Sequence, residues 1–282
     1  MLLRKCADQT GLTGALGGVF ARLGGSVVWD RGVVLVQLAV AIALGATSMR
    51  QIALLAHQDG VFGKPASDST VRRVLEPIGA SEQVQAKIAR ARARLRGHVW
   101  DLIAATETGF PWLVVAGKTL TGWVVIDLDA TLITAHSNKQ GASATFKKGW
   151  GFHPLAAWCA QTQECLAMLL RTGSAGSNTI VDHVRVLSEA IRQIPESFRA
   201  KIWIRIDGAG ATHDLVEHMK SLNTTRRTVR FTVGWKITEA DEAAIAKLPD
   251  RAWQAAIRQD GEAHEHAGVA ELTHLDERAA AW

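Results

Sequence analysis

The sequence predicts an α/β (α+β) protein in which a helical N-terminal third precedes a mixed sheet. Apolar residues recur at helical spacing up to about residue 105. From Trp123 onward the pattern becomes that of strands: segments rich in valine and isoleucine, in which apolar and polar residues alternate. The 282 residues, 48% of them hydrophobic, are enough to build a substantial core. We therefore expect a helical region at 1–105 and a sheet core at 119–236.

Composition excludes several classes of protein. Three cysteines are too few for a disulfide scaffold or a four-sulfur zinc site. The chain has no tyrosine, so no mechanism in which a tyrosine hydroxyl attacks phosphorus is available. The most apolar stretch, residues 33–46, is shorter than the roughly 20 residues of a membrane span. We expect a cytoplasmic protein, and its net charge of +5 permits a polyanionic partner.

Residues 47–78 have the pattern of a helix-turn-helix. A short helix precedes a connection with glycine and proline at 59–65, and a second, capped helix is expected to end at Pro77. In a DNA reader, the outward side chains of such a second helix meet bases and phosphates. The candidates here are Thr70, Arg72 and Arg73. An ordinary helical pair with a solvated basic face is the alternative.

A second basic segment, KIARARARLRG at 87–97, carries five cations and no acid. Like charges at i, i+4 repel by a few tenths of a kcal/mol, a cost that nearby phosphates would offset through counterion release. Arg90 and Arg94 are therefore further DNA-binding candidates, although a solvated helix face explains the pattern equally well.

Carboxylates stand in two of the predicted strands. Asp127 and Asp129 lie on one side of the strand that begins at Trp123. Asp207 lies with Arg205 on one side of the strand in KIWIRIDGAG, which Gly208 and Gly210 end. A buried carboxylate is costly unless it is paired or binds a metal. Capping by Asp207, or pairing of the other two acids with Arg205, is the structural alternative.

The order of the elements bears on these acids. Three strands are followed by a helix with Asn178 as its predicted cap, then a strand, a helix and a last strand. This is the order of the ribonuclease-H-like fold, in which the first and fourth strands are neighbours. Paired carboxylates there suit Mg²⁺ or Mn²⁺. Such a site would activate a water or a 3′-hydroxyl for attack on phosphorus.

Several segments together resemble DDE transposases of the insertion-sequence 1380 family. They are DLDATLITAHSNKQGASATFKKGWGFHPL, LLRTGSAGSNTIVDH and RIDGAGATHDLV, and SDSTVRRVL resembles the family's N-terminal region. The resemblance covers nearly the whole chain. It implies that Asp129 and Asp207 are the first two members of an acidic triad that binds Mg²⁺ (or Mn²⁺). It further implies cleavage and strand transfer of insertion-element ends in double-stranded DNA by a homodimer.

The resemblance also implies which cations lie near the site. His136, Lys139, Lys147 and Lys148 would be close to the acids, and we take Lys147 and Lys148 as DNA-binding residues. The third acid of the family is a glutamate beyond a strand-rich insertion. Residues 237–282 would be the start of that insertion, so we expect a truncated transposase that is impaired or inactive. A non-catalytic end-binding protein or repressor, and a metal-dependent nuclease, are the alternatives.

Overall fold

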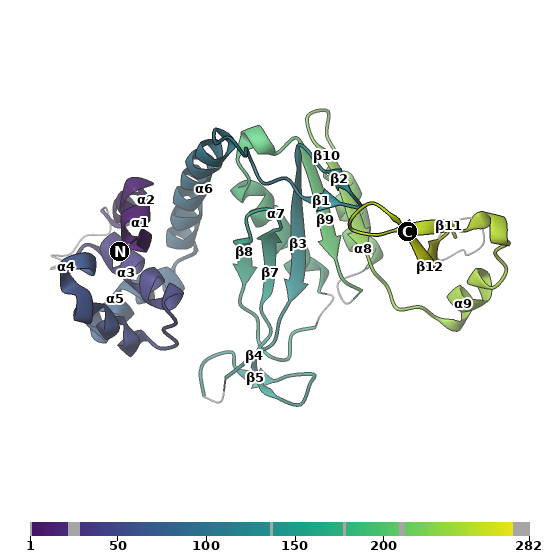
Figure 1. The fold of residues 1–282 in the computed structure, drawn as a ribbon. Coiled ribbons are helices and arrows are strands. Elements are labelled where there is room, and N and C mark those ends of the chain that lie inside the picture. The colour runs from purple at the N-terminus through teal and green to yellow at the C-terminus, as the bar shows by residue number, and fades with distance from the viewer. Residues whose placement is uncertain (1, 22–28, 136–137, 177–178, 209–211, 273–282) are drawn as a thin grey trace. The chain divides into compact units, whose positions relative to one another are not determined.

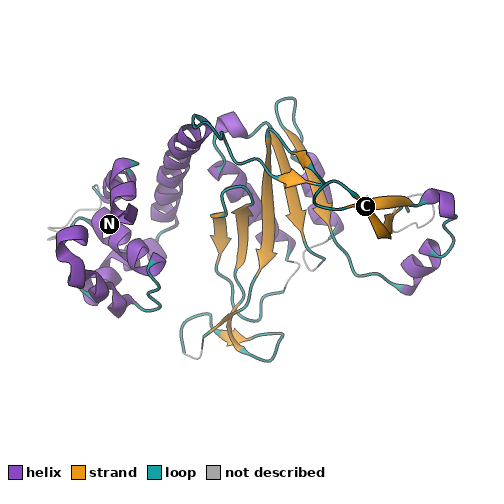
Figure 2. Ribbon diagram, in the orientation of Figure 1, coloured by secondary structure: helices purple, strands orange, loops and turns teal. Residues whose placement is uncertain are grey.

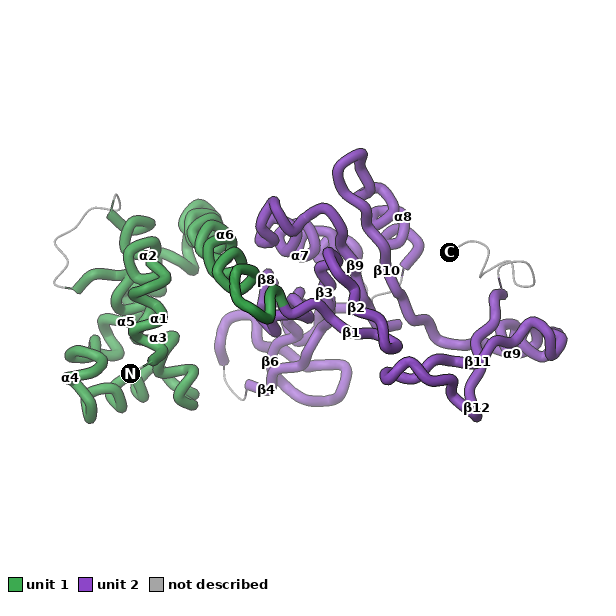
Figure 3. Tube along the Cα trace, turned by 45° about the horizontal axis from the view of Figure 1, so that its top comes forward, with its two compact units in different colours: residues 1–110 green, residues 111–282 purple. Residues whose placement is uncertain are grey.

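The computed structural model describes residues 2–21, 29–135, 138–176, 179–208 and 212–272. The chain divides into two compact units, residues 1–110 and 111–282 (Figure 3). No helix in the described ranges is both long enough and apolar enough to cross a membrane.

The first unit is built of helices (Figure 2). They are α1 (Leu2–Gln9), α2 (Leu12–Phe20), α3 (Arg31–Ala43), the 3₁₀-helix η1 (Met49–Gln58), α4 (Asp59–Phe62), α5 (Asp68–Ala80) and α6 (Glu82–Ala104). Asp30 caps α3 by accepting a hydrogen bond from the Val33 amide at 2.9 Å. The amide of Gln37, buried in the middle of α3, bonds to the Lys64 carbonyl at 3.0 Å and to the Ala66 amide at 3.2 Å. One polar side chain thus ties the segment before α5 to the core.

Two details of the predicted helix pair are wrong. The first predicted helix is present as the 3₁₀-helix η1, but the expected connection at 59–65 begins with the short helix α4. The second helix does not end at Pro77, which lies inside α5, three residues before its end at Ala80. A proline here removes only the hydrogen bond to the carbonyl of Arg73, four residues earlier, so the last turn continues past it.

The second unit contains a five-stranded mixed sheet. Its strands and helices are β3 (Trp123–Ala130), β7 (Leu155–Cys159), β8 (Glu164–Leu169), α7 (Ile180–Gln193), β9 (Lys201–Ile206), α8 (His213–Ser221) and β10 (Thr228–Val233). The spatial order is β10-β9-β3-β7-β8, with β7 antiparallel to its two neighbours and β9 parallel to β3 and β10. The first strand of the sheet lies at its centre, between the second and the fourth. The predicted ribonuclease-H-like order is therefore confirmed (Figure 1).

The core of this unit lies between the sheet and its helices. Val124, Ile126 and Leu128 of β3 are buried, and so are Ile202 and Ile204 of β9. Helix α7 packs on β7 and β8, and α8 packs on β10. Alternation then places Asp127, Asp129 and their neighbours on the opposite face. Asn178, the expected cap of α7, is outside the described residues.

A second, smaller sheet follows the carboxyl end of β3 and was not predicted. It has the order β4-β6-β5, with β4 at Ile133–Thr134, β5 at Ser143–Ala144 and β6 at Trp150–Phe152. The strand predicted from Trp123 therefore stops at Ala130. A Cβ on Gly151 would collide with the carbonyl oxygen of Ile133, so the close approach of β4 and β6 requires glycine there. The remaining elements are β1 (Val114–Val115), β2 (Lys118–Thr119), η2 (Glu196–Phe198), α9 (Glu239–Ile245), η3 (Asp250–Ala252), β11 (Gln254–Ile257) and β12 (Ala263–Val269).

Candidate functional site

Asp127 forms an ion pair across the sheet. It lies directly opposite Arg205 in the parallel register of β3 and β9. The guanidinium donates to both carboxylate oxygens, through Nε at 2.6 Å and Nη2 at 2.8 Å. The Asp127 hydrogen bond raises the pKa of Arg205 further above its ordinary value. Of the two acids that could pair with Arg205, Asp127 is the one that does, and its oxygens are occupied by a bidentate partner.

Asp129 and Asp207 occupy the next matching step of the same two strands. The last paired residues are Leu128 and Ile206, and each acid is the next residue after one of them. Both acids therefore lie at the carboxyl ends of parallel strands. Neighbouring strands are about 4.8 Å apart, and matched positions point to the same face. Both residues are exposed. The Ala130 amide donates to Asp129 Oδ1 at 2.8 Å, and the Thr131 hydroxyl to Oδ2 at 3.4 Å, which orients this carboxylate.

A buried imidazole lies within electrostatic range of Asp207. His183 of α7 is buried, with Nδ1 2.9 Å from the Thr179 carbonyl oxygen. Burial lowers its pKa below the ordinary 6.5, and the charge of Arg171 adds to this. The hydrogen bond to the Thr179 carbonyl and the charges of Asp182 and Asp207 act in the opposite direction. His183 is therefore neutral at pH 7.

Arg171 ties together the segments behind the acids. Its guanidinium is buried and donates to the His153 carbonyl at 2.9 Å, to the Gly176 carbonyl at 3.0 Å and to Asp182 at 3.3 Å. One side chain thus joins the segment before β7, the loop after β8 and the first turn of α7. Its charge is used for positioning, because its bonds go to the protein itself.

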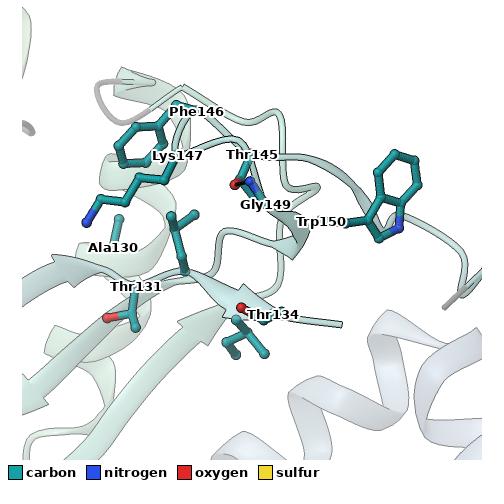
Figure 4. Close-up of a pocket in the computed structure, with 10 residues that line it drawn as sticks. Ala130, Thr131, Thr134, Thr145, Phe146, Lys147, Gly149 and Trp150 are labelled. Atoms are coloured by element: carbon teal, nitrogen blue, oxygen red, sulfur yellow. Dashed lines mark hydrogen bonds between the residues drawn. The ribbon is translucent and has the colours of Figure 1, made fainter. Parts of the chain in front are cut away.

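A groove begins beside Asp129. Residues 130–134 form one wall, and Thr145, Phe146, Lys147, Gly149 and Trp150 contribute the other, enclosing about 520 Å³ (Figure 4). Lys147 and Lys148 are both exposed at this hairpin, and Lys147 lines the groove. The structure thus brings Lys147 to the segment that follows the first acid. His136 is outside the described residues.

The first unit carries the other predicted DNA-binding side chains. Arg72 and Arg73 are exposed on α5, and Thr70 has its hydroxyl 2.9 Å from that of Ser67. Arg90 and Arg94 on α6, with Lys87, line a groove of about 440 Å³ against Gly14 and Gly18 of α2.

The full length of the chain, residues 1–282, matches the sequence family described as "Transposase DDE domain group 1". The chain belongs to this family. No curated protein matches it.

Three solved structures of Mos1 transposase are similar to this DDE transposase family member. The paired-end complex with the left transposon end and the pre-cleavage transpososome each match at 11% identity and a TM-score of 0.27. The strand transfer complex matches at 12% identity and a TM-score of 0.26. Each covers 74% of this chain, which spans about 60% of the Mos1 chains. Because these TM-scores are low, the fold is assigned from the strand order of the sheet and not from the Mos1 structures.

Sequence reasoning missed two parts of the site in this family member. Neither the small sheet β4-β6-β5 nor the groove that it forms was predicted, because its strands are only two or three residues long. Arg171 was also overlooked, and its position between two apolar leucines and a glycine turn gave no sign of its three partners. No described residues form a cluster of three or more His, Cys, Asp or Glu side chains that could hold a metal ion.

Proposed function

We propose that this chain is a DNA transposase of the insertion-sequence 1380 type that cleaves and joins element ends with Asp129 and Asp207. The observation that supports this most is that Asp129 of β3 and Asp207, directly after β9, each follow the last paired residues of these parallel neighbours by one position. Family membership supplies the reaction class. Double-stranded DNA is the proposed substrate, bound by a homodimer.

The donor set fits a hard divalent cation. Asp129 and Asp207 are exposed carboxylates about one strand spacing apart, and Mg²⁺ or Mn²⁺ prefers such oxygens while keeping several waters. When bound, the ion would lower the pKa of a water or 3′-hydroxyl and polarise the phosphate. The chain's own residues hold the site in place: Thr131 and the Ala130 amide orient Asp129, while Arg205 engages the neighbouring Asp127.

The cations would hold the DNA. Lys147 and Lys148 would contact phosphates near the acids, while Arg72 and Arg73 of the first unit, with Thr70, would meet the element end. Arg90 and Arg94 would follow the backbone. Binding of this kind would keep the protein on the bacterial nucleoid.

A non-catalytic end-binding protein is the second candidate. The observation that favours it is that the cations of α5 and α6 lie in a unit separate from the acids, so DNA binding does not require the acids. A metal-dependent nuclease would nick DNA without joining it.

One experiment tests these proposals together. The full chain is mixed with duplexes taken from the DNA that flanks its coding sequence and with scrambled duplexes, at two salt concentrations, with and without Mn²⁺. Binding, nicks and joined strands are scored on the same gels. Metal-dependent nicking that Asp129→Ala and Asp207→Ala both abolish supports the catalytic proposal, and nicking that survives both variants refutes it.

The DNA-binding residues need a separate comparison. Arg72→Gln with Arg73→Gln is expected to weaken binding and to lower the slope of log affinity against log salt by about one unit for each phosphate that is no longer neutralised. Arg251→Gln with Arg258→Gln, which removes two exposed charges of the second unit, serves as the matched control. Equal weakening by the two variants would mean that only net charge matters.

A further inference from the structure

Two aromatic side chains lie exposed on the wall of the groove beside Asp129. Phe146 has 65% of its surface accessible and Trp150 43%. In Figure 4 the Phe146 ring and the Lys147 side chain lie together near Ala130 and Thr131, and Trp150 lies at the far end of the hairpin. The volume of about 520 Å³ is within the range of pockets that hold a small molecule, roughly 300–1,000 Å³.

The hairpin that carries Phe146 is held by its own hydrogen bonds. The Thr145 amide donates to the Gly149 carbonyl at 2.9 Å, and the Lys148 amide donates to the Thr145 carbonyl at 3.0 Å. The Gly149 amide also donates to the Thr145 hydroxyl at 3.1 Å. Lys148 has a positive φ of 61°, the left-handed conformation that lets the chain reverse here. The aromatic ring is therefore presented by a preformed turn.

Phe146 is also supported from behind. Its ring centroid is 5.5 Å from that of His153, with the planes tilted by 50°. His153 is itself buried, with Nδ1 2.9 Å from the Ala175 carbonyl oxygen. Because most of its surface is still accessible, the ring offers a flat surface for stacking.

The segment that forms the groove carries charges of one sign. No aspartate or glutamate occurs between Asp129 and Glu164, whereas Lys139, Lys147 and Lys148 all do. The Lys147 ammonium is 5.8 Å from the centre of the Phe146 ring. Aromatic faces beside lysines are the combination that binds single-stranded nucleic acid, because every base has a face that stacks and every phosphate a negative charge.

We propose that this groove binds an unpaired nucleotide of the DNA strand that is cut at Asp129 and Asp207. Its base stacks on Phe146 or Trp150, and its phosphate contacts Lys147. A base inside an intact duplex presents only its edge and cannot stack on a side chain, so the groove selects for strand ends that are frayed or overhanging. This inference rests on the proposed function, since it assigns the groove to the same substrate.

The test is fluorescence titration of the full chain in EDTA, where no nicking takes place. The probes are a duplex with a three-nucleotide single-stranded overhang containing 2-aminopurine and a blunt duplex of the same sequence. We expect quenching of the 2-aminopurine and tighter binding of the overhang. Phe146→Leu and Trp150→Leu should weaken overhang binding by about 5- to 140-fold, the equivalent of ~1–3 kcal/mol per stacked base. Both should bind the blunt duplex within about twofold of the unmodified chain.

Trp253→Leu, which removes another exposed tryptophan, is the control and should change neither affinity. Thermal unfolding of each variant shows whether it is folded. Equal affinity for overhang and blunt duplexes, or overhang binding unaffected by both groove variants, overturns the proposal. So does light scattering in which Phe146→Leu turns a dimer into a monomer, because the ring would then be covered by a second copy.

Nicking in Mn²⁺ separates this proposal from the one on which it rests. Nicking that requires Asp129 without any preference for the overhang refutes the groove alone. A preference for the overhang that depends on Phe146, without nicking by the unmodified chain, refutes the catalytic proposal alone.

Discussion

Asp127 and Asp129 are chemically identical and lie two residues apart on one face of β3, yet we predict opposite results for their replacement by asparagine. Asp127 is held by Arg205 through two charge-assisted hydrogen bonds, at 2.6 and 2.8 Å. Asp129 lies at the matching step to Asp207, a second carboxylate. The first substitution removes an attraction, and the second removes a repulsion.

The magnitudes follow from exposure. The side chains of Arg205 and Asp127 are 46% and 37% accessible, so the pair contributes about 1 kcal/mol, the upper end for a solvated ion pair. Asp127→Asn should lower the Tm of a unit of this size by about 2–4 °C. Two carboxylates about 5 Å apart repel by about 1 kcal/mol in water-like surroundings. Asp129→Asn should therefore leave the Tm unchanged or raise it by about 2–4 °C when no metal is present.

Bound metal is expected to reverse which of the two variants has the higher Tm. At about one hundred times its Kd, Mn²⁺ stabilises the folded state by about 2.7 kcal/mol, which corresponds to a rise in Tm of about 5–11 °C. We expect this rise in the unmodified chain and in Asp127→Asn, but not in Asp129→Asn. The measurement is calorimetry with and without Mn²⁺, and EDTA should reverse every shift.

Either of two outcomes would refute this reasoning. A Mn²⁺-induced rise that persists in Asp129→Asn would mean that the metal binds elsewhere. A rise that disappears in Asp127→Asn, with the ordinary decrease in Tm, would mean that Asp127 is the ligand and that the pair with Arg205 opens when metal binds.

Three further predictions concern the surroundings of the acids. Gly151→Ala should destabilise the small sheet by about 1–3 kcal/mol, as overpacking does, because the added Cβ meets the Ile133 carbonyl. The same variant should weaken overhang binding in the fluorescence titration, and unchanged binding would contradict this prediction. Arg171→Met should lower the free energy of unfolding, measured in urea, by about 2–3 kcal/mol, the value of hydrogen bonds from a buried charge. A smaller effect would mean that the segments joined by Arg171 keep their positions without its hydrogen bonds. His183 has a pKa below its ordinary 6.5, so the stability it contributes is complete above pH 6.5 and is lost as the pH falls, since the unfolded chain then binds the proton. Urea unfolding at pH 7.5 and 5.5 should show a smaller acid destabilisation in His183→Gln, and an equal one would refute the assignment.

The sheet could be predicted because each strand carries its own pattern. In β3 the buried Ile126 and Leu128 alternate with Asp127 and Asp129, and in β9 three isoleucines alternate with Lys201, Trp203 and Arg205, so period and order together define the topology. The small sheet could not be predicted because its strands are too short to show a period. It forms through close backbone approach at Gly151, which depends on residues brought together only in the folded chain.

The roles of the acids were open for a related reason. From the sequence, Asp127 and Asp129 were equal candidates for pairing with Arg205, since both lie on the correct face of the strand. Only the register distinguishes them: Asp127 lies opposite Arg205, and Asp129 falls one alternate step further along. Register is a property of two strands and cannot be read from either one alone.

The ion pair also has a consequence for the acidic pair. A slip of β3 against β9 by one residue would turn the buried valine and isoleucine side chains outward, and packing forbids it. A slip by two residues keeps every apolar side chain on its face, so the hydrophobic pattern alone opposes it weakly. Such a slip would place Arg205 opposite Asp129 and remove the match with Asp207. The bidentate bond between Asp127 and Arg205 exists only in the observed register, and it therefore stabilises the one alignment in which Asp129 and Asp207 meet.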